Sequence, residues 1–280
     1  MATRPRLFLL FTHKINTMRN KLILILMASC VLSACAKSPM GRNQLIMMPD
    51  TQVNQIGLQA FTQLKQTKPV SRNAHYINFV NCVAHPLTQL VGEGAWEIIV
   101  FEDASLNAFA LPGNKIGVHS GLVNMVDNPA ELAAVIGHEI GHVLAKHANE
   151  RISGETFAKQ SMGLLGAVVG VDQSLSMQLG MSALGLGVKY GVLMPYGRTH
   201  ESEADVMGLD LMAKSGFDPR QSINLWVKMS QAKNGQAEPE YMSTHPSDAS
   251  RIDNLNQNMA RAMQEYQQAK AQGKHPSCSK

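Results

Sequence analysis

The segment that most constrains this 280-residue chain is His138-Glu139-Ile140-Gly141-His142. Residues four apart on an α-helix project from one face about one turn apart, so His138 and His142 can bind one metal ion. Glu139 would then lie beside the metal, where its carboxylate can take a proton from a water molecule. The spacing therefore predicts a Zn²⁺ site on a helix, with two histidine ligands and Glu139 as the general base.

Capping residues predict the start of that helix. Asn128 can act as the N-cap, Pro129 suits the first helical position, and Glu131 can close a capping box. We expect the helix to run to about Arg151. Its apolar residues indicate burial, where an unpaired histidine or glutamate would be costly, so the alternative of a helix with surface histidines is disfavoured.

A catalytic zinc site needs a third protein ligand and an open position for water. The sequence Glu201-Ser-Glu-Ala-Asp205 offers two carboxylates on one helix face, whereas Glu203 lies about 160° away from Glu201. This geometry predicts that Glu201 is the third ligand and that Asp205 orients a histidine ring from behind. The alternative for either acid is a solvated helix face.

The other histidines are weaker candidates for the site. His147 is five positions past His142, about 140° round a continuous helix, and so should not share the metal. His200 is next to Glu201 but is expected to face elsewhere. The remaining candidates are expected to be structural or exposed: His75, His85, His119 and His275.

The pattern of elements predicts an α+β chain that is mostly helical, with a small three-stranded sheet. Strands are expected at 96–101 and 115–119, with 107–112 between them. Further helices are expected at about 51–66, 72–91, 199–214, after Asp218-Pro219, and at 247–271, with a polar loop at 233–246. Residues 161–193 are rich in Gly, Ala, Leu and Met, but polar residues interrupt them. Buried or membrane-leaning helices are therefore favoured there over a membrane span.

The N-terminus resembles a bacterial lipoprotein signal. Basic residues after Met18, which could be the true start, precede an apolar run that ends in Leu32-Ser-Ala-Cys35. We expect residues 1–35 to be a signal peptide with a lipobox and Cys35 to carry lipid; the alternative is an ordinary signal peptide cleaved nearby. By resemblance to enterobacterial lipoproteins, Ala36 favours the outer membrane. The expected organisation is a tether at 36–50, one domain at 51–272 and a tail at 273–280.

The cysteines and the net charge limit the class of protein further. Cys82 and Cys278 remain after the signal, and in an oxidising compartment they could form a disulfide or stay as two thiols. The net charge of +4 is mild, and no run of Lys or Arg forms a stripe. Nucleic acid is therefore not an expected partner.

The metal motifs resemble those of peptidase family M48. The similarity extends over roughly residues 40–260 and rests on four segments. These are Asn107-Ala-Phe-Ala-Leu-Pro-Gly113, Gly121-Leu122, Gly137-His-Glu-Ile-Gly-His142 and Arg198-Thr-His-Glu-Ser-Glu-Ala-Asp205. The resemblance implies a zincin-like (gluzincin) metallopeptidase domain. It is nearest to the lipoprotein peptidases of the LoiP and BepA type, without the BepA repeat domain.

The same resemblance implies further site residues. His245, in a Thr-His-Pro segment, would lie near the metal as an oxyanion donor or a switchable fourth ligand, and Arg251 would face the site. The alternative is a loop histidine and a solvated arginine. Gluzincins bind peptides along an edge strand, which implies substrate contacts at Asn107, Ala108 and Phe109.

The resemblance also implies a role in the cell. We expect a zinc-dependent endopeptidase, lipid-anchored at the periplasmic face of the outer membrane, that hydrolyses misfolded or misassembled envelope proteins. The outer-membrane assembly machinery is a candidate partner. Two alternatives are a chaperone or assembly factor for outer-membrane proteins with minor proteolysis, and a zinc hydrolase of cell-wall peptides.

Overall fold

The computed structural model describes residues 35–92, 94–169, 197–232, 240–245 and 249–280, and the chain divides into two compact units, 1–47 and 48–280. The described part of the first unit is an antiparallel hairpin of β1 (Cys35–Lys37) and β2 (Asn43–Leu45). Gly41 takes a left-handed φ of 83° in its turn, and Ser38 donates its backbone N–H to Arg42 at 2.8 Å. The predicted tether at 36–50 therefore contains a paired hairpin instead of irregular chain.

The second unit is built on a three-stranded sheet of order β3-β5-β4, which confirms the predicted small sheet. Its strands are β3 (Glu97–Phe101), β4 (Ala108–Leu111) and β5 (Lys115–His119). β3 runs parallel to β5, and β4 runs antiparallel to it with Ala110 opposite Ile116. Among the described residues no strand pairs with the outer side of β4, so β4 is an edge strand.

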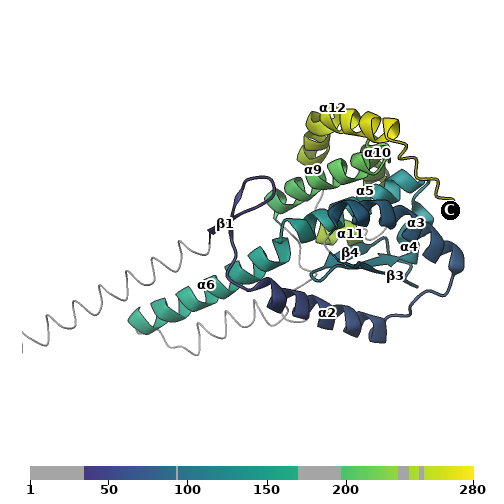
Figure 1. The fold of residues 1–280 in the computed structure, drawn as a ribbon. Helices are drawn as coiled ribbons and strands as arrows, with labels where there is room; N and C mark the ends of the chain where they lie inside the picture. The colour runs from purple at the N-terminus through teal and green to yellow at the C-terminus, as the bar shows by residue number, and fades with distance from the viewer. Residues whose placement is uncertain (1–34, 93, 170–196, 233–239, 246–248) are drawn as a thin grey trace, which may run out of the picture. The chain divides into compact units, whose positions relative to one another are not determined.

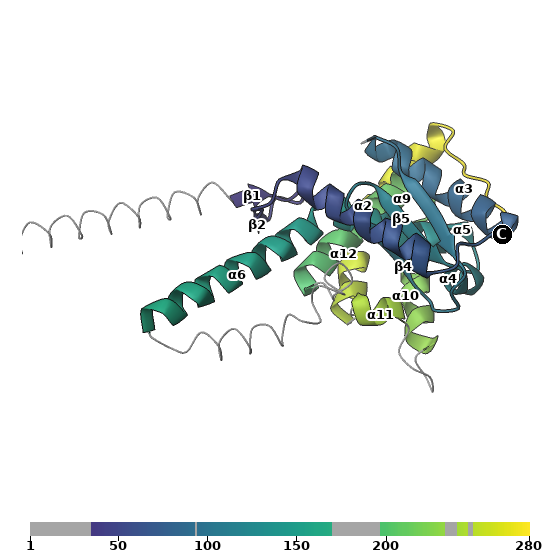
Figure 2. The same cartoon turned by 90° about the horizontal axis from the view of Figure 1, so that it is seen from below.

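Helices cover both faces of this sheet (Figures 1 and 2). On one face α3 (Ala74–Val91) and α5 (Pro129–Leu144) pack on apolar side chains of all three strands, and this is the main hydrophobic core. On the other face α2 (Asp50–Thr67) buries Phe61 against Phe101 and Phe109. Helix α5, which carries His138, Glu139 and His142, is therefore held in the interior of the unit.

The remaining described helices complete the unit around α5. They are α4 (Ser120–Met125), α6 (His147–Val169), α9 (Arg198–Lys214), α10 (Gln221–Ala232), α11 (Glu240–Thr244) and α12 (Ala249–Ala271). α9 packs along α5, and α12 packs along α9. The architecture is mostly helical α+β, as predicted. The prediction of a polar loop throughout 233–246 is wrong at 240–244, which form the helix α11.

The helix expected to run from 128 to about Arg151 is broken in two. Asn128 caps α5 by accepting the N–H groups of Ala130 and Glu131, as predicted. The helix then ends at Leu144, because Lys146 takes a left-handed φ of 53°, and α6 starts at His147. A left-handed residue cannot continue a right-handed helix, so the two helices point in different directions.

The C-terminal segment belongs to the same unit. Cys82 on α3 and Cys278 form a disulfide with Cα atoms 5.7 Å apart, which decides between the two sequence alternatives. Lys280 donates its ammonium group to the carbonyl oxygens of Asn124 and Val126. The predicted tail at 273–280 is therefore attached to the domain by covalent and polar contacts.

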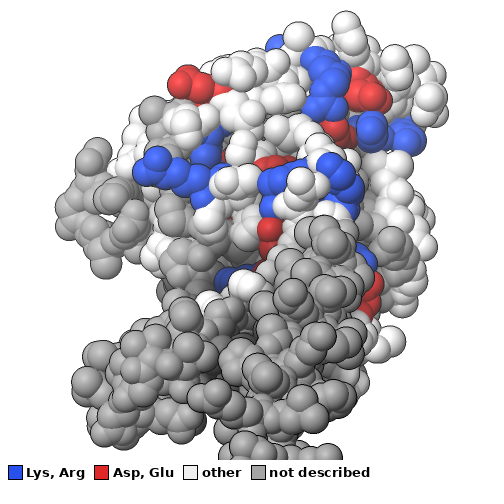
Figure 3. Space-filling model, turned by 90° about the vertical axis from the view of Figure 1, so that its left-hand side faces the viewer, with Lys and Arg blue, Asp and Glu red and all other residues white. Residues whose placement is uncertain are grey.

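Two predictions fall largely outside the described residues. These are the predicted signal peptide at 1–35, of which only Cys35 is described, and most of the Gly- and Ala-rich segment at 161–193. None of the helices in the described part of the chain is long and apolar enough to span a membrane. On the face shown in Figure 3, Lys and Arg side chains lie among Asp and Glu side chains.

Candidate metal centre

Small residues bring α5 and α9 into backbone contact, and this contact assembles the centre. A Cβ atom added at Gly208 would lie 2.6 Å from the backbone nitrogen of His138, and one added at Gly137 would lie 2.9 Å from the carbonyl oxygen of Gly208. One turn further along, a Cβ at Gly141 would lie 3.0 Å from the carbonyl oxygen of Ala204. Because the helices approach this closely, side chains from each can share a single point in space.

Four buried side chains meet at that point. His138, His142, Glu201 and His245 each offer one ligand atom, and these atoms lie within 4.8 Å of one another. The Nε2 atoms of His138 and His142 are 3.0 Å apart, and each lies 3.4 Å from a carboxylate oxygen of Glu201. Nδ1 of His245 lies 3.2 Å from Nε2 of His138 and 3.1 Å from Oε1 of Glu201. The structure thus brings together the three predicted ligands and His245.

This group fits a zinc ion. Ligand atoms about 2.1 Å from one tetrahedral zinc lie about 3.4 Å from each other, and nitrogen and oxygen donors are the types that zinc accepts. The spacings of 3.0 to 3.4 Å among the four side chains agree with that arrangement. Burial of three histidines around one carboxylate is also costly unless a cation or protons compensate it.

The electrostatics of the metal-free polypeptide differ from one ligand to the next. Burial lowers the pKa of His138, but hydrogen bonds to Asp205 and Glu201 overcome it and raise that pKa to about 9. The pKa of His142 is held well below its usual value by burial and by the nearby charge of His138. Burial raises the pKa of Glu201, but His245, His138 and His142 outweigh it and lower that pKa. A neutral His142 and an ionised Glu201 are the forms that bind metal, whereas His138 would release a proton on binding it.

Asp205 and Arg251 form a layer behind the ligands. Asp205 accepts a hydrogen bond from Nδ1 of His138 at 2.9 Å, which directs Nε2 of that ring toward the other ligands, as predicted for Asp205. Arg251 pairs with both oxygens of Asp205 at 2.6 and 2.7 Å and with Glu201 at 2.8 Å. Its guanidinium also stacks over Trp226 at 4.0 Å. Arg251 is thus aimed at carboxylates, so its predicted action on a substrate carbonyl stays a prediction.

Glu139 connects the centre to the edge strand. Its Oε2 accepts the backbone N–H of Ala110 at 3.1 Å, and its Oε1 lies 3.4 Å from Nε2 of His245. Oε1 of Glu139 is buried and makes no hydrogen bond within the described chain. The carboxylate is therefore fixed by β4 at one oxygen, while the other is directed at the centre.

The edge strand refines the predicted substrate contacts at Asn107, Ala108 and Phe109. The carbonyl oxygen of Asn107 accepts the N–H of His119, so the backbone of Asn107 faces inward, and the ring of Phe109 packs against Phe101 on the far face of the sheet. Backbone groups alternate in direction along a strand, so the backbone groups of Ala108 and Ala110 point away from β5. Ala108 is fully buried, however, and the N–H of Ala110 is bound to Glu139. Ala110 keeps some exposed surface and lines a cavity, so it is the residue of β4 best placed to contact a bound peptide.

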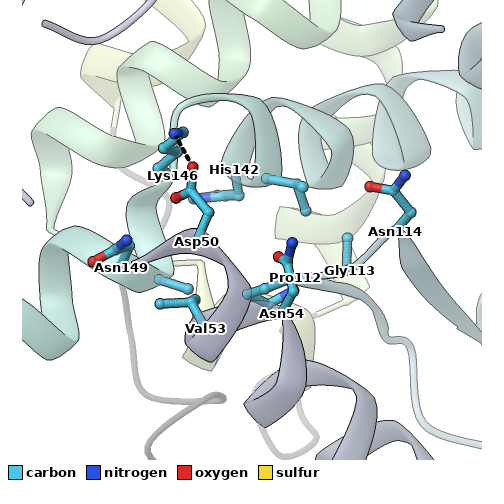
Figure 4. A pocket seen from close by; sticks show the side chains of 12 residues that line it. Asp50, Val53, Asn54, Pro112, Gly113, Asn114, His142, Lys146 and Asn149 are labelled. Carbon is cyan, nitrogen blue, oxygen red and sulfur yellow. Dashed lines mark hydrogen bonds and ion pairs between the residues drawn. The ribbon is translucent and has the colours of Figure 1, made fainter. Parts of the chain in front are cut away.

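A cavity opens beside this edge (Figure 4). It has a volume of about 120 Å³, and His142 and Ala110 form part of its wall. At its rim the ammonium group of Lys146 pairs with Asp50 at 2.5 Å. The other lining residues come from α2, from the turn after β4 and from the junction of α5 and α6: Val53, Asn54, Pro112, Gly113, Asn114, Val143, Ala148 and Asn149.

Sequence reasoning missed two residues beside the centre. His147 is fully buried, and its Nδ1 lies 2.9 Å from Nδ1 of His142. Its Nε2 lies 3.1 Å from Oε2 of Glu203, which is also buried. The prediction placed His147 on a continuous helix and gave Glu203, on the face of α9 away from Glu201, no role at the site. The helix break at Lys146 is what brings His147 back toward the site.

Comparison with known proteins agrees with this geometry. The profile of peptidase family M48 matches residues 71–259, which is more than half of the chain. The chain belongs to peptidase family M48. This confirms the predicted family, and with it the metallopeptidase class that the buried group of three histidines and one glutamate supports.

Several relatives are similar over part of their length. The mitochondrial metalloendopeptidase OMA1 of Arabidopsis thaliana is 37% identical over 164 residues, which is 59% of this chain and 32% of that protein. The OMA1 enzyme of Saccharomyces cerevisiae is 35% identical over 182 residues, 62% of this chain and 50% of that protein. The beta-barrel assembly-enhancing protease of Escherichia coli (strain K12) is 28% identical over 206 residues, which is 71% of this chain and 42% of that protein. The chain thus spans a third to a half of these relatives.

Proposed function

We propose that this M48 protein is a zinc-dependent endopeptidase of the bacterial envelope. The observation that carries the proposal is the buried group of His138, His142, Glu201 and His245, with Glu139 bound to the edge strand beside it. His138, His142 and Glu201 would hold one zinc ion per chain. When bound, the ion would lower the pKa of a water molecule and polarise the scissile carbonyl.

Glu139 is proposed as the general base and acid. Its Oε1 is directed at the centre, so it can accept the proton of the attacking water and deliver that proton to the leaving amine. The hydrogen bond from Ala110 holds the other oxygen and keeps the carboxylate in place. Asp205 and Arg251 keep His138 and Glu201 in position, and His245 is close enough to donate to the carbonyl oxygen.

The substrate is proposed to bind as an extended peptide along β4. Ala110 lies on the unpaired side of β4 and lines the cavity, so its carbonyl oxygen can form a backbone hydrogen bond with a peptide of almost any sequence. Recognition of the backbone suits misfolded or misassembled proteins, in which extended segments are exposed. The similarity to a beta-barrel assembly-enhancing protease supports outer-membrane proteins, and their assembly machinery, as candidate partners.

Attachment to the membrane is proposed through lipid on Cys35. The support is the sequence pattern Leu32-Ser-Ala-Cys35 after a basic and apolar segment. Cells that express the chain with Cys35 should incorporate labelled palmitate into it, and Cys35→Ser should abolish the label. A label that persists in Cys35→Ser would refute lipidation at this residue.

The decisive experiment is Glu139→Gln, with Glu265→Gln on α12 as the matched control. The amide keeps the hydrogen bond to Ala110 but cannot act as a base, so cleavage of an unfolded protein such as casein should fall at least about 10³-fold. Zinc content, measured by elemental analysis, should stay near one per chain in both variants. Undiminished cleavage by Glu139→Gln would contradict the mechanism.

A chaperone for outer-membrane proteins is the second candidate, since one relative is named for its effect on barrel assembly. Complementation of an envelope-stress phenotype separates the two. If Glu139→Gln complements as well as the wild type, the chaperone function is sufficient. If it fails while the protein is present at normal levels, proteolysis is required.

A further inference from the structure

His142 is the second zinc-ligand candidate on α5. Its Nδ1 atom, on the side of the ring away from the other ligands, has a polar partner. Nδ1 of His142 lies 2.9 Å from Nδ1 of His147, and Nε2 of His147 lies 3.1 Å from Oε2 of Glu203. All three side chains are buried. The three residues come from three different helices, α5, α6 and α9, so this line of contacts is a tertiary feature.

The valences of the rings fix the direction of these hydrogen bonds. A histidine that binds metal through Nε2 keeps its proton on Nδ1, and so His142 must donate from that atom. Nδ1 of His147 must then accept, which leaves the proton of that neutral ring on Nε2. Nε2 of His147 therefore donates to the carboxylate of Glu203. Each of these two hydrogen bonds, from His142 to His147 and from His147 to Glu203, thus has one donor and one acceptor.

The fold provides this arrangement at a local cost. Lys146 takes a left-handed φ of 53°, which is unfavourable for a residue with a side chain. Because of it α6 starts in a new direction, and His147 lies against the ring of His142 instead of far round the helix. His200 then stacks on His147 with ring centroids 4.3 Å apart, which restricts rotation of the His147 ring.

We propose that His147 and Glu203 are positioning residues for His142, as Asp205 is for His138. His147 fixes the tautomer and the ring orientation of His142, and Glu203 fixes those of His147. The inference rests on the proposed role of His142 as a metal ligand. It predicts that each of the two histidines of the motif has its own carboxylate, one in direct contact and one acting through an intervening imidazole.

The test is zinc affinity, measured by competition with a chromophoric chelator. His147→Leu removes the acceptor and should weaken zinc binding about 10- to 100-fold. His147→Asn places an amide oxygen where Nδ1 of the imidazole was, and should recover most of the affinity. His85→Leu, at an exposed histidine on α3, is the matched control and should bind zinc as the wild type does.

The order of the two variants separates positioning from packing. Leucine fills a buried space better than asparagine, so a purely structural role predicts that His147→Asn is the more damaged protein. Positioning predicts the reverse order in zinc affinity, whatever the order in the thermal stability of the metal-free proteins. A His147→Leu variant that binds zinc like the wild type, or more tightly than His147→Asn, would overturn the proposal.

Glu203→Leu provides the second arm. If Glu203 acts through His147, adding Glu203→Leu to His147→Leu should weaken zinc binding little further. If the two substitutions instead weaken zinc binding by factors that multiply, Glu203 does not act through His147. A wild-type chain that binds no zinc would overturn both this inference and the proposed function. Tight zinc binding by the wild type, with the same affinity in His147→Leu, would overturn this inference and leave the proposed function standing.

Discussion

Gly208 lies where α5 and α9 are closest, and its replacement by alanine is expected to disturb the metal centre without touching a ligand. A Cβ atom at this position would lie 2.6 Å from the backbone nitrogen of His138 and 2.8 Å from the carbonyl carbon of Gly137. Neither atom belongs to a flexible side chain. The Gly208→Ala variant can therefore fold only if the two helices separate.

The size of the effect follows from that distance. Ordinary contact begins at 3.4 Å, so the Cβ atom has to move by about 0.8 Å. Overpacking of this kind costs about 1 to 3 kcal/mol, and each kcal/mol lowers Tm by about 2 to 4 °C in a domain of this size. Metal–ligand distances tolerate only about 0.2 Å. Separation of Glu201 from His138 should thus weaken zinc binding at least about tenfold.

The assay is thermal unfolding by circular dichroism, with and without zinc, together with the chelator competition. Gly154→Ala on α6 is the matched control, because a Cβ there meets nothing within 4 Å. It should leave zinc affinity unchanged and raise stability by about 0.5 to 1 kcal/mol. If Gly208→Ala retains both the Tm and the zinc affinity of the wild type, the helix contact does not set the ligand geometry.

Three further perturbations test other parts of the structure. Reduction of the Cys82–Cys278 disulfide, or serine at both positions, should lower the free energy of unfolding by about 2 to 5 kcal/mol in urea titrations, since the bridge closes a long loop. Burial raises the pKa of Asp103, but Lys68 outweighs it and holds that pKa below its usual value. The stabilisation is therefore present above pH 4 and lost as pH falls, so the Tm difference between wild type and Asp103→Asn should shrink below pH 4. Arg251→Met removes the guanidinium that pairs with the buried carboxylates of Asp205 and Glu201, and should cost about 3 to 5 kcal/mol in the metal-free protein by the same titration.

Features that depend on one helix could be predicted from the sequence. The spacing of His138 and His142 puts both rings on one face of α5, and the same spacing selects Glu201 and Asp205 on α9. Asn128 and Pro129 mark the start of α5 because capping is a local property.

Features that depend on the distance between helices could not be predicted in this way. The approach of α5 and α9 depends on glycines that face each other, and a single sequence does not show which glycines do so. His147 was misplaced because no local signal predicts a left-handed Lys146, a conformation that is uncommon for residues with a Cβ atom. An error at one backbone angle therefore left His147 out of the predicted site, and with it the residue that connects Glu203 to His142.

His245 has two possible uses that the geometry makes mutually exclusive at any one moment. Its Nδ1 lies 3.2 Å from Nε2 of His138 and 3.1 Å from Glu201, and its Nε2 lies 3.4 Å from Glu139. The ring thus lies between the ligand group and the general base. A water molecule that is to be activated must contact both of these, and so it needs the same space. The ring can fill that space as a fourth ligand, or it can leave it and donate to the carbonyl oxygen of a substrate.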